Sequence, residues 1–521
     1  MTHVTDRLVE PASREDVRWR WDGFLARSYL FSVEPIDPKP AELREVPLPD
    51  GHLFISPDYY CHVQRVDPSF IVLIGYCIDL EAPEATESDI ALSLLQRALR
   101  DGIEAMLAST DYLTGRFAVI CHVAGRWHVF PDANATRTIY YAEDRPAIAS
   151  HSTILGSLIG AVPRTDIFKH YWCALPGNAS AVPGVRVLPA NFVLDLDSRQ
   201  LRRFWPRSER VERPVADVID ELDTLLARTA AATVARWKPL LSLTAGVDSR
   251  LSLSILYGTP DLVAFTYDRD EEDAIDVEGA RRLCEMLGIE HRRLPLVERW
   301  RAERAYQLIE SIVECSFDKN VAPIFLSAFG DMDGAVIHIR SSLTGIGKAF
   351  WRYHPGMPTS FDPANWLYVS LSKLTTHLPY RQEAAEYLRA EMQRFFALVG
   401  YDSVDPRSPQ IMGYDVWDLI YVEHRMSTWH APALSAFDMA VETSILFNCR
   451  RILDILMSVP LLDRRKATLF HMIIARHCPQ IADIPVNPRP RRTVSELAAA
   501  AYRQFKRRIG LVRAIEARLK F

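Results

Sequence analysis

The stretch PLLSLTAGVDSRLSLSILYG, residues 239–258, joins an apolar run to a helical pattern through a short loop. Residues 240–243 have no polar face, which predicts a strand that is buried on both sides near the centre of a parallel sheet. The following residues, 249–257, are predicted to form a helix. The loop between them therefore lies where a strand ends and a helix begins, which is the edge of the sheet where α/β proteins bind ligands.

Strand and helix patterns alternate after this loop. Strands are predicted at 261–268 and 291–296, and a helix over about 276–287 ends at Gly288, a residue type that often terminates helices. Another helix is predicted over 215–237, and its apolar stripe consists of Val218, Leu222, Leu225 and Leu226. This order, with short connections, predicts an α/β domain with a doubly wound parallel sheet.

Residues 1–205 have a different pattern, in which short apolar or alternating runs are separated by turn residues. Strands are predicted within the segments 52–66, 69–80, 116–132, 138–144 and 191–198. The clearest helical stretch is 89–107. This mixture predicts an α+β domain. The charged, proline-bracketed segment 203–214 is the predicted linker, which gives two domains, 1–205 and 206–521.

Length and charge exclude several classes of protein. The chain has 521 residues, which is more than one hydrophobic core usually holds. Its formal net charge of −5 does not indicate a general affinity for nucleic acid or membranes. The first residues lack the apolar core of a secretion signal, and no apolar run reaches the roughly 20 residues that span a bilayer. The eight cysteines are scattered, which predicts free thiols and no zinc site. We expect a soluble, cytoplasmic protein without a nucleic-acid partner.

The loop of residues 244–249 has the residue types of an anion-binding site. Gly246 permits a sharp turn, the hydroxyls of Thr244 and Ser249 can donate hydrogen bonds, and the helix offers unpaired N–H groups. Asp248 would repel a polyphosphate unless a divalent cation lay between them, which predicts Mg²⁺. The alternative is that Asp248 and Ser249 only cap the helix. The chain has no GxxxxGK[ST] segment, which excludes the other common type of phosphate loop.

The segment LSLTAGVDSR, residues 241–250, resembles the pyrophosphate-binding loop of ATP pyrophosphatases, and the whole chain resembles the asparagine synthetase family. The order of further segments is also similar to that family: 113–155, 182–205, 265–268, 276–292 and 441–460. The resemblance implies an Ntn-hydrolase-like amidotransferase domain with antiparallel sheets and helices. A PP-loop synthetase domain with a helical C-terminal part would follow, with ATP and Mg²⁺ as cofactors.

The same resemblance assigns nucleotide contacts to residues on the loop, the next strand and a later glycine-containing segment: Ser242, Thr244, Ala245, Gly246, Val247, Asp248, Ser249, Thr266, Gly345 and Gly347. Asp248 is the implied metal ligand. The later segment, RSSLTGIGKAFWRY at 340–353, keeps the glycine spacing but has Lys348 near the place of acidic residues in the family. Lys348 could balance polyphosphate charge or could be a solvated surface lysine.

Amide formation also requires a group that removes a proton from the amine. The candidates on the segments that resemble the family's substrate side are Tyr353, His354, Glu423 and Glu442, of which Glu442 could instead be a structural ion-pair partner. The family places a late lysine near the acyl group, and here Arg489, Arg491 or Arg492 would have to replace it. The predicted catalytic residues are Lys348, Tyr353, Glu442 and Arg489.

The first residues depart from the glutamine-hydrolysing members of the family. Thr2 stands where those members have a nucleophilic cysteine, and the early glutaminase pattern is missing. Although an N-terminal threonine can act as a nucleophile, these departures predict that domain 1–205 does not hydrolyse glutamine. The chain is therefore similar to the branch that contains β-lactam synthetase and the lasso-peptide cyclases.

The resemblance implies an ATP-dependent amide synthetase that forms AMP and pyrophosphate and acts on a small-molecule or peptide substrate. An ammonia-dependent asparagine synthetase and a catalytically impaired ATP-binding scaffold are the alternatives. The basic, partly apolar tail at 489–521 predicts either a packed C-terminal helix or a docking segment for a carrier or partner protein.

Overall fold

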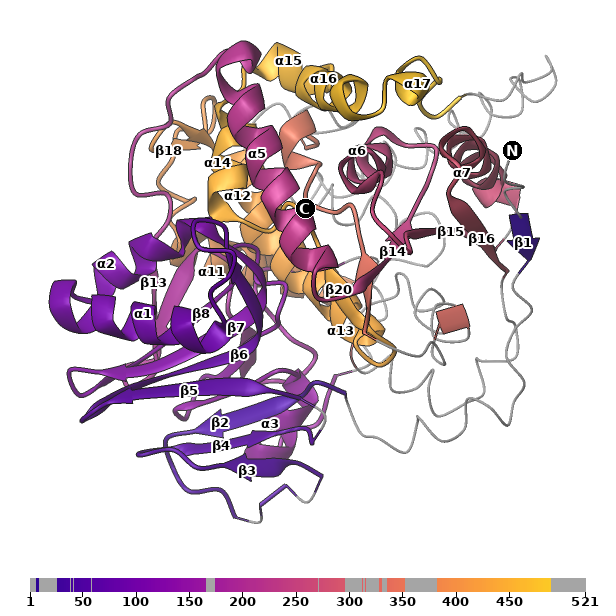
Figure 1. The fold of residues 1–521 in the computed structure, drawn as a ribbon. Coiled ribbons are helices and arrows are strands. Elements are labelled where there is room, and N and C mark those ends of the chain that lie inside the picture. Colours follow the sequence, from indigo (N-terminus) through magenta and orange to yellow (C-terminus); the bar gives the residue numbers. More distant parts are fainter. Residues whose placement is uncertain are drawn as a thin grey trace.

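A computed structural model of the chain describes residues 6–8, 26–37, 39–40, 42–57, 59–164, 174–269, 271–295, 312, 314, 328–329, 335–351 and 382–488. These residues form two antiparallel sheets and one parallel sheet with helices around them (Figure 1). The predicted combination of antiparallel and parallel sheets is confirmed at this level.

The two antiparallel sheets contain most of the strands before residue 205. The first sheet has the spatial order β11 (Val185–Val187), β9 (Tyr140–Ala142), β10 (Ala147–Ala149), β2 (Tyr29–Ser32), β4 (His52–Ile55) and β3 (Arg44–Val46). The second has the order β13 (Gln200–Arg203), β12 (Phe192–Asp195), β8 (Arg126–Pro131), β7 (Leu113–Val123), β6 (Ser69–Asp79) and β5 (Cys61–Val66). Almost every residue of β6 and β7 is buried, so these two central strands form the core of this part of the chain.

Helices cover the second antiparallel sheet. The helix α1 (Glu87–Asp101) packs on β5 and β6, and α2 (Ile103–Ala108) follows it directly. Gly102 separates the two helices because its φ of 87° lies in a region that glycine tolerates and other residues rarely adopt. The predicted helical stretch 89–107 is therefore divided at this glycine. A short helix, α3 (Ser152–Ile159), packs on the first sheet.

The parallel sheet has the spatial order β1 (Asp6–Leu8), β16 (Glu290–Pro295), β15 (Val263–Asp268), β14 (Lys238–Ser242), β17 (Val336–Ile339) and β20 (Glu442–Ser444). All neighbouring strands in it are parallel. The helix α5 (Val215–Val234) precedes β14, α6 (Val247–Leu256) lies between β14 and β15, and α7 (Ala274–Leu287) lies between β15 and β16. Gly288 ends α7 with a φ of 67°, as the sequence predicts.

The direction of the chain across the parallel sheet reverses at β14. From β14 the chain passes through α6, β15 and α7 to β16, whereas β17 and β20 lie on the other side of β14. Such a reversal opens a crevice at the carboxyl ends of the two strands that flank it. The crevice here lies between the ends of β14 and β17, beside the 244–249 loop.

The strand β1 lies at the edge of the parallel sheet, next to β16 and apart from the antiparallel sheets (Figure 1). Its register pairs Asp6 with His291 and Leu8 with Arg293. The predicted domain limits, 1–205 and 206–521, assign residues 6–8 to the N-terminal domain, whereas the structure pairs them with β16 of the parallel sheet. Thr2 lies outside the described residues.

The C-terminal part that the structure describes is mainly helical, as predicted. Its helices are α11 (Gln382–Val399), α12 (Val416–Ile420), α13 (Ala431–Phe437), α14 (Arg450–Ser458), α15 (Leu461–Arg465), α16 (Thr468–His477) and α17 (Pro479–Ala482). A π-helical segment, Tyr421–His430, joins α12 to α13, and a small hairpin consists of β18 (Gln410–Ile411) and β19 (Tyr414–Asp415). Within the described ranges, none of the helices has the length and apolar character needed to cross a bilayer.

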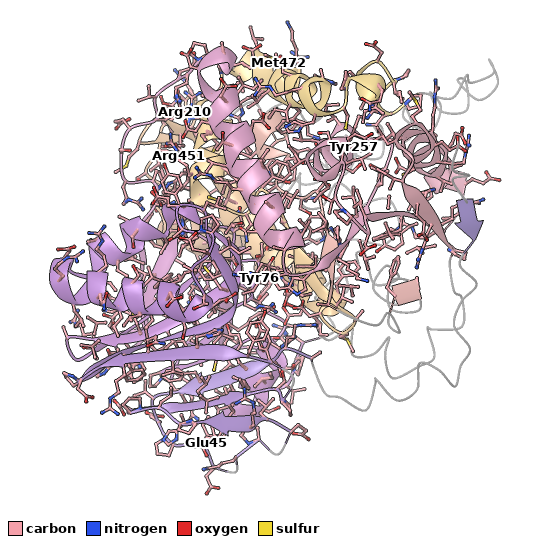
Figure 2. All side chains as sticks on the ribbon, viewed as in Figure 1. Glu45, Tyr76, Arg210, Tyr257, Arg451 and Met472 are labelled. Atoms are coloured by element: carbon pink, nitrogen blue, oxygen red, sulfur yellow. The ribbon has the colours of Figure 1, made fainter. Side chains whose placement is uncertain are left out.

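Buried ion pairs connect the antiparallel sheets to the C-terminal part. Arg116 and Arg137 are almost fully buried, and both contact the carboxylates of Asp438 and Glu442. Tyr76 lies at the same junction, where its hydroxyl donates to the carbonyl oxygen of Thr443 at 3.2 Å (Figure 2). We call the four charged residues the junction cluster. It fixes the position of the chain just before β20.

Candidate functional site

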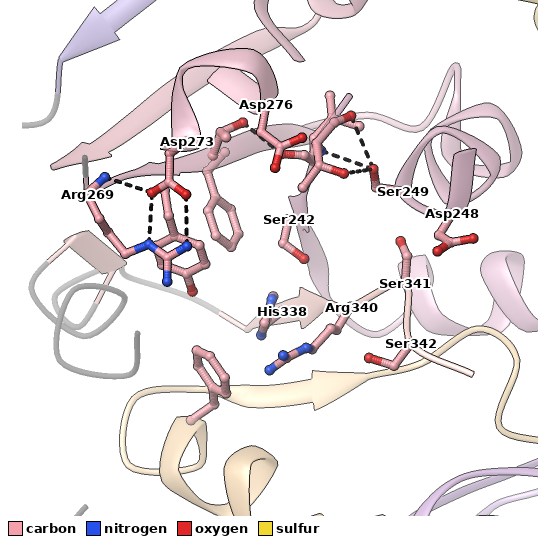
Figure 3. Close-up of a pocket in the computed structure, with 16 residues that line it drawn as sticks. Ser242, Asp248, Ser249, Arg269, Asp273, Asp276, His338, Arg340, Ser341 and Ser342 are labelled. Atoms are coloured by element: carbon pink, nitrogen blue, oxygen red, sulfur yellow. Dashed lines mark hydrogen bonds and ion pairs between the residues drawn. The ribbon is translucent and has the colours of Figure 1, made fainter. Parts of the chain in front are cut away.

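A cavity of about 310 Å³ lies at the carboxyl ends of β14, β15 and β17 (Figure 3). Its wall consists of Ser242, Leu243, Thr244, Asp248, Ser249, Phe265, Thr266, Tyr267, Arg269, Asp273, Asp276, His338, Arg340, Ser341, Ser342 and Phe437. Five of the residues predicted to contact a nucleotide are on this wall: Ser242, Thr244, Asp248, Ser249 and Thr266. The cavity occupies the switch point that the strand order creates.

The 244–249 loop is held by its own side chains. The backbone N–H of Thr244 donates to Ser249 Oγ at 3.0 Å, and the two hydroxyl oxygens are 2.9 Å apart. The N–H of Gly246 donates to Thr244 Oγ1 at 3.2 Å. These bonds fix the loop before any ligand arrives.

The helix α6 begins at Val247, and no side chain caps its first turn. Asp248 and Ser249 lie within that turn, so the capping alternative is wrong. The first turn of a helix leaves N–H groups unpaired, which is the property of an anion-binding site. Gly246 has a φ of −73°, an ordinary extended value, so a sharp turn is not the reason for a glycine at this position.

The helix α7 supports the loop from behind. Asp276, in its first turn, accepts a hydrogen bond from the N–H of Ala245 at 2.9 Å. Gly279 lies against the same residue, because a Cβ atom on Gly279 would be 2.5 Å from the Cβ atom of Ala245. Neither Asp276 nor Gly279 was predicted from the sequence to support the loop. The glycine within an otherwise regular helix was the available signal.

Replacement of Gly279 by alanine is expected to destabilise the protein, although alanine normally stabilises the interior of a helix by about 1 kcal/mol. The added methyl group would force α7 away from the loop, and overpacking of this kind costs about 1–3 kcal/mol. Urea denaturation measures the effect. Glu278→Ala, a change at an exposed position on the same helix, is the control, and a higher midpoint for Gly279→Ala would contradict the close contact.

A C-terminal segment also packs behind the loop. Arg250 is almost fully buried and donates to the carbonyl oxygens of Ile484 and Pro485. The N–H of Asn487 donates to the carbonyl oxygen of Ala245 at 3.1 Å. Burial lowers the pKa of Arg250. The loop is therefore positioned by residues that are more than 200 positions away in the sequence.

Asp248 forms an ion pair with Lys348, which lies 100 positions later in the chain. Lys348 Nζ is 2.6 Å from Asp248 Oδ2. Asp248 Oδ1 is buried and has no hydrogen-bond partner among the described residues. Lys348 ends a 3₁₀ turn, Ile346–Lys348, and it is the partner of Asp248 rather than an isolated solvated lysine.

The glycines that flank this turn face protein atoms. A Cβ atom on Gly345 would be 2.7 Å from the Tyr421 hydroxyl oxygen, and one on Gly347 would be 2.5 Å from the ring of Phe470. Neither glycine lines the cavity. Close packing explains both residues, and their contact with a nucleotide stays a prediction, as it does for Ala245 and Val247.

The proposed bases that the structure describes lie away from the cavity. Glu442 belongs to the junction cluster, where it contacts Arg116 and Arg137, so its position favours the structural alternative over a catalytic role. Glu423 is fully buried and bonds to Arg203, Asn191 and Tyr401. Tyr353, His354, Arg489, Arg491 and Arg492 lie outside the described residues.

The part of the wall that β17 and α13 supply contains residues that were not predicted from the sequence. Arg340 and Ser342 follow β17, and Phe437 ends α13. Arg340 and Ser342 lie at the start of the glycine-containing segment 340–353, so their place near the site could have been predicted from the sequence. His430, which contacts Ser342, gave no signal because it lies 88 positions away in the sequence.

No known protein family profile matches the chain, and no curated protein matches it. Two solved structures with distant similarity to the chain are the following. A glutamine phosphoribosylpyrophosphate amidotransferase from B. subtilis is 13% identical with a TM-score of 0.20, over 58% of this chain and 63% of that enzyme, less than two thirds of its length. An NH3-dependent NAD synthetase from Campylobacter jejuni is 10% identical with a TM-score of 0.18, over 36% of this chain and 97% of the other. Similarities at this level assign the chain to no family.

Proposed function

We propose that the protein is an ATP-dependent ligase of the asparagine synthetase type, with a PP-loop synthetase part and an Ntn-like N-terminal part that does not hydrolyse glutamine. It adenylates a carboxylic acid, releases pyrophosphate, joins the acyl group to an amine of a small molecule or peptide, and releases AMP. One observation carries the proposal: the 244–249 loop and the uncapped first turn of α6 line one cavity at the switch point of the parallel sheet, and Asp248 on that wall is paired with Lys348.

The residues of this wall suit a pyrophosphate group. The first turn of α6 supplies N–H donors, and the hydroxyls of Thr244 and Ser249 lie beside them. Lys348 adds a positive charge next to Asp248. Attack of a carboxylate on phosphorus requires charge neutralisation and alignment more than acid or base catalysis, so these groups are sufficient for the first step.

Fewer residues of the site are suited to hold Mg²⁺ than to hold a pyrophosphate group. Asp248 Oδ1 is a buried carboxylate oxygen without a described partner, and an oxygen of this kind is a suitable ligand for Mg²⁺. However, among the described residues no three His, Cys, Asp or Glu side chains are grouped to hold a metal. Mg²⁺ brought by the nucleotide would neutralise phosphate charge. Asp248 would contact it through Oδ1 while Oδ2 stays with Lys348.

ATP–pyrophosphate exchange tests the proposal directly. The purified protein is incubated with ATP, labelled pyrophosphate and a panel of carboxylic acids. Exchange that depends on one acid supports adenylation and names the substrate class. ATP binding without exchange would favour the scaffold alternative, and exchange with aspartate followed by asparagine formation from ammonia would favour the ammonia-dependent synthetase.

Replacement of Lys348 by methionine is expected to weaken ATP binding by about tenfold or more, because it leaves the Asp248 carboxylate uncompensated beside the polyphosphate. The loss should be larger without Mg²⁺ than with it. Calorimetric titration with ATP, with and without Mg²⁺, measures both effects. Lys238→Met, at the opposite end of β14, is the matched control, and equal affinities for Lys348→Met and the wild type would remove Lys348 from the site.

A further inference from the structure

Ser342 and His430 form a close pair at the cavity. Ser342 is on the cavity wall, and its Oγ atom is 2.6 Å from His430 Nε2. Figure 3 shows Ser342 and Arg340 on the other side of the cavity from Asp276. Ser342 therefore lies on the part of the wall that follows β17, across the cavity from the first turn of α7.

His430 is held in a buried and electrically positive environment. It is the last residue of the π-helical segment Tyr421–His430, a type of structure that is frequent at functional sites. Its side chain is 1% exposed, and its Nδ1 atom has no hydrogen-bond partner among the described residues. Burial, followed by the charges of Arg340, Arg425, Arg116 and His338, holds the pKa of His430 well below its usual range. The imidazole is therefore neutral and is a poor proton acceptor.

The surroundings of the ring decide which nitrogen carries the hydrogen. With the hydrogen on Nδ1, a buried N–H would have no acceptor, and such groups are rare because they are costly. With the hydrogen on Nε2, His430 donates to Ser342 Oγ. Ser342 has no other described partner, so its own hydroxyl hydrogen is then directed away from His430 and toward the cavity.

Arg340 lies on the same wall. Its guanidinium group is stacked over the ring of Phe437, with 5.4 Å between the guanidinium carbon and the ring centroid. The two acids on the cavity wall beyond β15 are already engaged, since Asp273 is paired with Arg269 and Asp276 binds the N–H of Ala245. Arg340 places a positively charged group on this part of the cavity wall, where it can contact a negatively charged group of a ligand.

We propose that Arg340 and Ser342 form an oxyanion subsite that binds the carboxylate of the acyl substrate, and that His430 is the positioning residue that orients the Ser342 hydroxyl. The inference rests on the proposed function. The planar, two-pronged guanidinium group matches the geometry of a carboxylate, and the 244–249 loop already carries the donors for phosphate. A phosphate group of the nucleotide is the other oxyanion that this chemistry could hold.

The hydrogen on His430 can be located without any substrate. Nitrogen-15 NMR of the histidine-labelled protein, with the signal assigned by its loss in His430→Gln, is expected to show the hydrogen on Nε2 and no titration near the usual pKa of about 6.5. A hydrogen on Nδ1, or titration near that value, would overturn the arrangement.

Steady-state exchange kinetics test the subsite. Ser342→Ala and Arg340→Met are expected to raise the KM for the acid about tenfold or more, the effect of losing a hydrogen bond to a charged group, and to change the KM for ATP less. Ser342→Thr keeps the hydroxyl and should retain most of the affinity. Ser458→Ala, which removes a buried hydroxyl in α14 that bonds to the carbonyl oxygen of Ile455, is the control.

Two replacements of His430 separate donation from proton acceptance. Glutamine can still donate a hydrogen bond to Ser342, so His430→Gln should retain most of the activity, whereas His430→Leu should resemble Ser342→Ala. Equal losses in both variants would overturn the positioning role.

Three further outcomes distinguish a carboxylate subsite from a phosphate subsite and test whether the subsite exists. A rise in the KM for ATP alone in Ser342→Ala would mean that the subsite binds a phosphate of the nucleotide. Normal exchange in Ser342→Ala would refute this inference and leave the proposed function intact. Absence of exchange in the wild type with every acid would refute the proposed function and the carboxylate assignment together.

Discussion

Replacement of Asp248 by alanine is expected to lower the rate of ATP–pyrophosphate exchange by about a hundredfold or more, the usual cost of removing one preorganised charged group from a reaction site. The carboxylate lies on the cavity wall, in the first turn of α6. It holds Lys348 through Oδ2 and offers Oδ1 to a cation. Its removal would therefore disturb both sources of positive charge that we propose for the pyrophosphate group.

Exchange assays at saturating acid and ATP measure this effect. Asp248→Asn, which keeps the shape of the side chain, should lose nearly as much activity because the charge holds Lys348. Asp261→Asn is the control, since Asp261 is largely exposed at the opposite end of the sheet. If both Asp248 variants exchanged at the wild-type rate, the 244–249 loop would not be the nucleotide site.

The double variant Asp248→Asn, Lys348→Met gives a second test of the ion pair. Residues that act as a unit show effects that are far from additive. We expect the double variant to be about as impaired as Asp248→Asn alone. Multiplied losses would mean that the two side chains act independently, in spite of the 2.6 Å contact.

The sequence predicts the local elements around the site well. The strand predicted at 240–243 corresponds to β14, Lys238–Ser242, and the helix that follows begins at Val247, two residues earlier than predicted. These elements depend on apolar runs and turn residues that are adjacent in the chain, so a local pattern is sufficient to find them. The helix α7 and its end at Gly288 were found for the same reason.

The contacts that give the site its chemistry could not be predicted in this way. Lys348 reaches Asp248 because β17 returns beside β14, and His430 reaches Ser342 through the helical segment before β20. Each pair depends on the order of strands in the sheet, which a single sequence does not specify. The resemblance to a family pointed to Lys348 but could not distinguish an ion pair from a solvated side chain.

Replacement of Asp438 by asparagine is expected to lower the free energy of unfolding by about 3–5 kcal/mol, the usual cost of removing one partner from a buried ion pair. Asp438 is 2% exposed and contacts both Arg116 and Arg137. The variant leaves two buried guanidinium groups with Glu442 as their remaining carboxylate in the junction cluster. Urea denaturation of the variant and the wild type measures the difference.

The pH dependence of stability identifies the cause of that loss. Burial alone would raise the pKa of Asp438, but Arg116 and Arg137 overcome this effect and hold the pKa well below its usual range. A carboxyl group with a lowered pKa in the folded state stabilises the protein above its unfolded pKa of about 3.9, and this contribution is lost as the pH falls below that value. The wild type should therefore lose stability below about pH 4 more steeply than Asp438→Asn.

Asp261→Asn, at an exposed carboxylate, is the control for this experiment and should keep the wild-type slope. An unchanged slope in Asp438→Asn would mean that Arg116 and Arg137 do not hold the pKa of Asp438 below its usual range. The link is direct in the sequence, since Asp438 follows Phe437, the residue on which Arg340 is stacked. A loss of the junction cluster should therefore weaken acid binding at Arg340 as well as overall stability, even in molecules that remain folded.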